Sequence, residues 1–222
     1  MTAGQSPLEW AARERRAARK GVRRRVLAWV GLNPAARRAD ALTARAAHGA
    51  AGERKTAELL ARLSEGWRIA YGRKLPPYAN DYDALVIPPA GDVVLALDTK
   101  MWRRNWVTSL HEGRVYCGPD DRQGQVEGVA RAAARLERAL AVPGLRVWPL
   151  LVVHGSPVMQ PGLPEGRLEA RAVEWDGVVH VLGPDWLVPT LVASARGGVD
   201  EERAAWLAER VNAVVPPCPG GA

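Results

Sequence analysis

Two segments decide the fold of this 222-residue chain: DYDALVI at residues 81–87 and VVLALDTK at residues 93–100. Both are rich in aliphatic and β-branched residues, and the sequence PPAGD between them is typical of a turn. They therefore predict a hairpin of two strands. Because side chains alternate between the faces of a strand, Asp98 and Lys100 are expected on one face. The hairpin would bring the acids that begin the first strand close to the acid and the lysine that end the second.

The flanking sequence predicts a mixed central sheet flanked by helices, which is an α/β fold. We interpret residues 1–47 as a basic helical N-terminal extension, residues 48–215 as the main domain and residues 216–222 as a disordered tail. Apolar periodicity predicts helices at 50–64, 122–140, 184–195 and 200–214, and strands at 67–71, 114–117, 145–153 and 178–182, with one more near residue 172.

Composition excludes several classes of protein. The chain has no apolar run of the roughly 18 residues that span a bilayer, and its basic start does not resemble a signal peptide, so we expect no transmembrane segment and a cytoplasmic location. Its two cysteines, Cys117 and Cys218, are far apart and predict neither a disulfide framework nor a zinc site. A homo-oligomer is compatible with this composition, but nothing in the sequence requires one.

The net charge of +7 is concentrated at the N-terminus. Residues 1–48 hold eleven Arg or Lys against three acids, a charge of +8, whereas residues 49–222 hold twenty against twenty-one, a charge of −1. A helix expected at 7–32 carries much of this charge and is either a solvated helix packed on the domain or a nucleic-acid-binding arm. Attachment to a membrane surface is a third option. If it is an arm, Arg16, Arg23 and Arg24 are its candidate phosphate contacts.

The hairpin acids suggest chemistry on a phosphodiester. Hydrolysis of this bond needs a cation on the phosphate, an activated water and a group that balances the charge of the transition state. Asp83 and Asp98 offer the hard oxygen ligands that Mg²⁺ or Mn²⁺ takes, and the backbone carbonyl of Thr99 would add another. Lys100 would position the water or stabilise the pentavalent phosphorane. An Asp-x-Lys sequence alone is a weak signal, and its position at the end of an apolar strand strengthens it.

From about His48 to Leu140 the sequence resembles the nuclease-related domain called NERD, a branch of the PD-(D/E)xK phosphodiesterase superfamily. The pieces that carry the resemblance are GAAGE at 49–53, DALVI at 83–87 with the prolines that follow, DTK at 98–100 with Trp102, and Gln125 at the start of a later helix.

The resemblance implies a restriction-endonuclease-like core and a catalytic set of Glu53, Asp83, Asp98, Lys100 and Gln125. It also implies that Glu53 helps to hold the metal. Each of the two outlying residues has a plainer interpretation: Glu53 would suit the first turn of any helix, and Gln125 would suit a solvated or capping position.

The chain departs from the family pattern at two positions beside Asp83. Ala84 stands where the family often has His, and Asp81 is an additional acid, which we interpret as a turn or supporting residue.

The leading hypothesis is a divalent-metal-dependent nuclease, an endonuclease or phosphodiesterase, that uses Mg²⁺ or Mn²⁺ and acts on DNA. Arg103, Arg104 and Arg122 are close to the proposed metal ligands in sequence and are candidate phosphate contacts. The alternative is a protein that keeps the nuclease fold but only binds nucleic acid or a partner. The four histidines have no metal-ligand spacing, so none is assigned a catalytic role.

Overall fold

The structure is a computed structural model that describes residues 12–14, 16–17, 20, 34–78, 81–195 and 197–218. Its centre is a six-stranded mixed sheet in the order β1-β2-β3-β7-β10-β9. The β2–β3 hairpin is antiparallel, as predicted, whereas β3, β7 and β10 run parallel. The strands of this sheet are β1 (Arg68–Lys74), β2 (Asp81–Ile87), β3 (Val93–Met101), β7 (Arg146–His154), β9 (Arg167–Ala172) and β10 (Trp175–Leu182).

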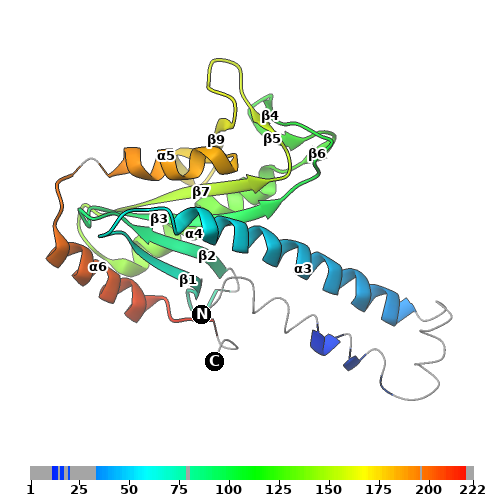
Figure 1. Ribbon diagram of the computed structural model, residues 1–222, viewed down its shortest axis with the longest axis horizontal. Helices are drawn as coiled ribbons and strands as arrows, with labels where there is room; N and C mark the ends of the chain where they lie inside the picture. The colour runs from blue at the N-terminus through cyan, green and yellow to red at the C-terminus, as the bar shows by residue number, and fades with distance from the viewer. Residues whose placement is uncertain are drawn as a thin grey trace.

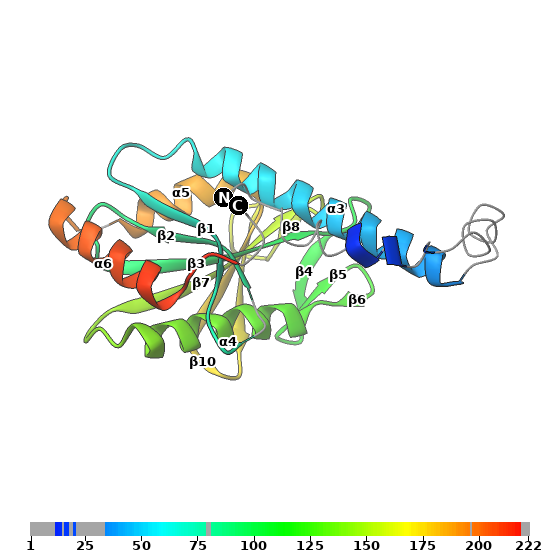
Figure 2. The ribbon, with the colours of Figure 1, turned by 90° about the horizontal axis from the view of Figure 1, so that it is seen from below.

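Helices cover both faces of the sheet and make three layers. Helices α3 (Pro34–Leu60) and α5 (Pro184–Ser194) lie on one face, and α4 (Gln123–Leu140) and α6 (Glu201–Val214) lie on the other (Figures 1 and 2). The hairpin side chains follow this division by alternation: Leu95 and Leu97 pack toward α3 and α5, whereas Val94 and Ala96 pack toward α4 and α6. The predicted α/β class with a mixed, helix-flanked sheet is thus confirmed.

Helix α3 is longer than the sequence suggested. The residues expected as a connector at 35–47 are helical and continue without a break into the helix expected at 50, because Ala and Arg are strong helix formers. The expected domain boundary at 47/48 therefore falls inside one helix. Figure 1 shows the first part of α3 extending beyond the sheet. Gly52 lets α3 approach β3 closely, since a Cβ there would lie 2.7 Å from the Met101 Cγ, whereas a Cβ at Gly49 would meet open space.

The turn of the β2–β3 hairpin is held against α6. Gly91 adopts a φ of +61° and donates its N–H to the Pro88 carbonyl at 2.9 Å. A Cβ at this position would lie 2.6 Å from the backbone nitrogen of Ala204, so only glycine fits. Asp200 caps α6 by accepting the Arg203 N–H at 2.9 Å.

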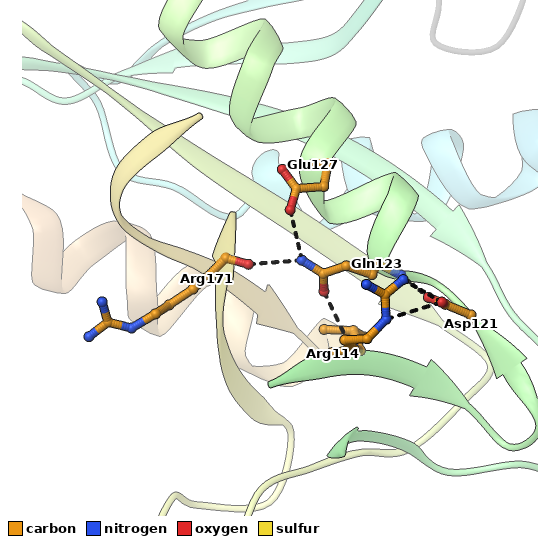
Figure 3. A network of polar contacts seen from close by, with 6 residues as sticks. Arg114, Asp121, Gln123, Glu127 and Arg171 are labelled. Carbon is orange, nitrogen blue, oxygen red and sulfur yellow. Dashed lines mark hydrogen bonds and ion pairs between the residues drawn. The ribbon is translucent and has the colours of Figure 1, made fainter. Parts of the chain in front are cut away.

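A second, four-stranded sheet packs at the end of the molecule where α4 begins. A buried glutamine, Gln123, joins the two parts (Figure 3). Its Oε1 accepts the Val115 N–H at 3.2 Å, and its Nε2 donates to the Arg171 carbonyl at 2.9 Å and to Glu127 at 3.1 Å. The strands of this sheet are β4 (Thr108–His111), β5 (Arg114–Cys117), β6 (Asp120–Asp121) and β8 (Val158–Met159).

The first residues after α6 pair with the edge strand β1. Lys74 donates its N–H to the Pro216 carbonyl at 3.2 Å, and Cys218 donates to the Gly72 carbonyl at 3.0 Å. The Cys218 side chain is buried. These contacts cover the outer edge of β1 and leave fewer unpaired backbone groups at the edge of the sheet.

Candidate active site

The site lies where β2 and β3 separate. Backbone pairing between the two strands covers residues 84–86 and 95–97. One residue beyond, the Asp83 side chain takes the place of the ladder and accepts the Thr99 N–H at 2.6 Å through Oδ2. The hairpin therefore places an acid from the start of β2 against the backbone of the Asp-Thr-Lys sequence, as predicted.

Asp98 and Lys100 form an ion pair beside this contact. Their side chains lie on the same face of β3, and Lys100 Nζ is 2.6 Å from Asp98 Oδ2. The same Nζ is 3.4 Å from the carbonyl oxygen of Thr99. Both side chains are mostly shielded, with exposures of 33% for Lys100 and 22% for Asp98. A charge-assisted contact of this length, with limited solvent screening, holds the ammonium firmly in the site.

The pKa values of Asp83 and Lys100 are both raised in the folded protein. Burial, followed by the charge of Asp98, raises the pKa of Asp83 well above its ordinary value of 3.8, and the opposing effects of Lys100 and the Thr99 N–H do not cancel this rise. Burial lowers the pKa of Lys100, but Asp98, Asp83 and Glu53 outweigh it, so the pKa of this lysine is raised overall. Lys100 is therefore held as a cation among carboxylates.

Glu53 reaches the same place from α3. It lines a groove of about 570 Å³ together with Asp83, Thr99 and Lys100, which we call the carboxylate groove. Its charge contributes to the raised pKa values of both Asp83 and Lys100. The helix thus brings a third carboxylate toward the strand ends, in agreement with the expected position of Glu53.

Gln125 lies on the other side of Lys100. It lines a smaller cavity of about 250 Å³ with Asp98 and Lys100, next to the first turns of α4. Its Oε1 accepts the indole N–H of Trp102 at 3.0 Å. Gln125 is therefore oriented by a side chain that follows the Asp-Thr-Lys sequence, rather than being a solvated residue at a helix start.

The candidate phosphate contacts are distributed more widely. Arg103 and Arg104 are exposed in the segment after β3, and the Arg103 guanidinium stacks on the Trp106 ring at 4.6 Å. Arg122 lies over Trp102, 5.5 Å from the ring, but pairs with Asp120 at 2.7 Å. Arg16 is exposed in a helical segment, and its Nε donates to the Ala12 carbonyl. Arg23 and Arg24 lie outside the described residues.

A buried polar chain supports the site, and no sequence pattern predicted it. Thr56 on α3 accepts the Thr99 hydroxyl at 3.1 Å and pairs with His154 Nε2 at 2.9 Å. His154 is buried at the end of β7, and its carbonyl accepts the Trp102 N–H. Three elements are thus tied to the residue that follows Asp98. A hydroxyl three residues after Glu53 was the available signal, but it is too common to be informative.

The donor set fits a hard divalent cation. Within the described residues no group of three or more His, Cys, Asp or Glu side chains is arranged to hold a metal ion. The available oxygens are instead two carboxylates and the Thr99 carbonyl, and Mg²⁺ commonly takes one or two carboxylates with water and phosphate completing its shell. Two of these oxygens, those of Asp98 and Thr99, already converge on one cation, the Lys100 ammonium. Burial and then the charge of Asp98 raise the pKa of Asp83, and a bound metal ion would favour its charged form against both effects.

Comparison with known proteins agrees with this geometry. Residues 48–154 match the family model described as nuclease-related domain, NERD. No curated protein and no solved structure matches the chain. No helix among the described residues combines the length and apolar character needed to traverse a bilayer. The segment that matches the nuclease-related domain, NERD, thus contains the hairpin, Glu53, the Asp-Thr-Lys sequence and α4.

Proposed function

We propose that this protein is a divalent-metal-dependent nuclease that hydrolyses phosphodiester bonds in DNA. One observation carries the proposal: within a nuclease-related domain, Asp83, Asp98 and Lys100 meet where two strands separate, beside a groove open to a substrate. This arrangement is costly for the fold, because a half-buried carboxylate with a raised pKa destabilises the protein unless something binds it. Such a cost is typical of a functional site.

In the proposed mechanism Asp83 and Asp98 hold Mg²⁺ or Mn²⁺ with the Thr99 carbonyl, and Glu53 supports the ion from α3. A bound divalent cation would neutralise charge on the scissile phosphate and lower the pKa of a bound water. Lys100, as a retained cation, donates hydrogen bonds to the phosphate oxygens as negative charge develops in the transition state. Gln125, held by Trp102, orients the groups on the opposite side of Lys100.

The test is plasmid nicking in the presence of Mg²⁺, Mn²⁺ or EDTA. Wild-type protein is expected to nick only with a divalent cation, and Lys100→Ala is expected to lose nicking while it stays folded and binds DNA. Lys74→Ala is a matched control. Lys74, at the end of β1, also forms an ion pair with an aspartate, since its Nζ lies 3.9 Å from Asp81 Oδ1 on β2. It is expected to nick like the wild type.

Equal nicking by wild type and Lys100→Ala would refute the assigned role of the lysine. Metal titration by calorimetry, with Asp83→Asn/Asp98→Asn as the comparison, separates the remaining outcomes. DNA binding without nicking, and with no metal binding that depends on these acids, would favour the alternative of a non-catalytic binding protein.

A further inference from the structure

A second groove adjoins the carboxylate groove and takes no part in the proposed hydrolysis. It encloses about 620 Å³ between the C-terminal half of α3, the segment after β3 and the end of β7. The two grooves share His48 and Met101 in their linings, so they lie next to each other. We call the second one the basic groove.

The charge of the basic groove is strongly positive. Among the described residues that line it, Lys55 and Arg62 come from the α3 side, Arg103 and Arg104 come from the segment after β3, and Glu58 is the one acid, so these side chains carry a net charge of +3 without the histidines. All four cations are exposed. In the described part of the chain none of them forms an ion pair. Their charges are therefore available to a polyanion, although the body of the chain is nearly neutral.

Two of the cations, Lys55 and Arg62, follow α3 and the turn after it, away from His48, which lines both grooves. His48 and Lys55 are seven residues apart on α3, which is about 10.5 Å along a helix. Arg62 follows in the turn that closes the helix, where its N–H bonds to the Leu59 carbonyl. A row of cations spaced along a groove suits the repeated phosphates of one nucleic-acid strand better than a single small anion.

The floor of the basic groove suits the less polar parts of a nucleotide. Leu59, Met101 and Pro184 line it between the cations. His154 also lines it, but burial and then the charge of Lys55 lower its pKa, so its ring adds no charge near neutral pH. Positive rims over a partly apolar floor are the arrangement by which proteins hold a strand without reading its sequence.

We infer that the basic groove receives the sugar–phosphate backbone of the strand on one side of the scissile phosphate, with Lys55, Arg62 and Arg104 as its phosphate contacts. This inference rests on the proposed function for the position of the scissile phosphate. The groove binds the strand without base specificity and directs it from the carboxylate groove along α3.

The experiment measures binding without cleavage. Fluorescence anisotropy in EDTA, with a fluorescein-labelled 20-nucleotide DNA as a single strand and as a duplex, is recorded over a series of salt concentrations for the full-length chain and for Lys55→Ala/Arg62→Ala/Arg104→Ala. We expect weaker binding and a shallower dependence of log K on log salt. Loss of three phosphate contacts flattens that slope by about 2 on a single strand or about 2.7 on a duplex.

Arg138→Ala is the matched control. Arg138 is an exposed arginine in the last turn of α4, on the other face of the sheet, and its Nε donates to the Ala134 carbonyl of its own helix. It should bind as the wild type does. An unchanged slope and affinity in the triple variant, or an equal loss in Arg138→Ala, would overturn the inference. Failure of the proposed function is detected separately. If DNA binding in EDTA depends on the basic groove but the protein does not nick DNA in Mg²⁺ or Mn²⁺, only the catalytic proposal is refuted.

Discussion

Replacing Asp83 by Asn is expected to stabilise the metal-free protein. The Asp83 carboxylate lies half-buried between β2 and β3 with Asp98 nearby, and its pKa is raised in the folded state. Asn has the same shape and keeps an oxygen for the Thr99 N–H that now bonds to Asp83 at 2.6 Å. The substitution thus removes the half-buried charge and leaves the hydrogen bond in place.

The sign and size of the effect follow from linkage between protonation and folding. An acid with a raised pKa binds its proton more tightly in the folded than in the unfolded state, so stability falls as pH rises from the ordinary value of 3.8 through the folded pKa. Above the folded pKa the full cost is present, at about 1.4 kcal/mol for every tenfold difference in proton affinity between the two states. In a chain of this length each kcal/mol moves the melting temperature by about 2–4 °C, so every such tenfold difference corresponds to about 3–6 °C.

Thermal melting in EDTA between pH 4 and pH 8 tests this prediction. Asp83→Asn should melt above the wild type at pH 8, and the gap should close as the pH falls and Asp83 takes up its proton. Added Mg²⁺ should stabilise the wild type alone. Asp121→Asn is a control of opposite sign, because Arg114 lowers the pKa of Asp121 and its carboxylate also accepts the Gln123 N–H. A variant that melts below the wild type at pH 8 by a pH-independent margin would refute the reasoning.

Two further predictions concern the framework of the site. Thr56→Val leaves His154 Nε2 and the Thr99 hydroxyl without their shared partner, so it should lower stability by about 1–3 kcal/mol in thermal melts. Thr56→Ser keeps the hydroxyl and should not lower it. Equal melting temperatures of the two variants would contradict the role assigned to this hydrogen-bonded chain. Gly91→Ala should lower stability by at least about 2 kcal/mol, because a positive φ costs about 1–2 kcal/mol and the new Cβ meets the Ala204 backbone. Gly113→Ala, with a φ of +76° and open space around it, isolates the conformational part, and similar losses in both would show that the contact with Ala204 is unimportant.

The elements with a strong local signal were predictable from sequence. The β2–β3 hairpin has a turn sequence between two apolar runs that are buried on both faces, and α4 buries its apolar residues at helical spacing, so both were found close to their true bounds. The positions of Asp83, Asp98 and Lys100 followed from the hairpin and from the alternation of side chains along a strand. Their catalytic roles stay predictions.

What sequence reasoning missed depends on contacts between distant segments. The small sheet is joined to the main sheet by Gln123, whose partners come from β5 and β9, and no local sequence pattern predicts such a residue. The pairing of residues 216–218 with β1 was missed because a Pro- and Gly-rich end is typical of disorder. The hydrogen-bonded chain through Thr56 was missed because it joins side chains from α3, β3 and β7, which are distant in sequence.

The position of β10 has a consequence for how this protein can be divided. The family match ends with β7, yet β10 pairs in parallel with β7 and supplies Leu182 to the core beneath the site, to which α5 adds Leu187 and Leu191. A fragment cut at residues 48–154 would expose one side of β7, lose those leucines and begin in the middle of α3. The segment that matches the nuclease family and the segment that shares one packed core therefore have different boundaries, and we expect the shorter one not to fold by itself.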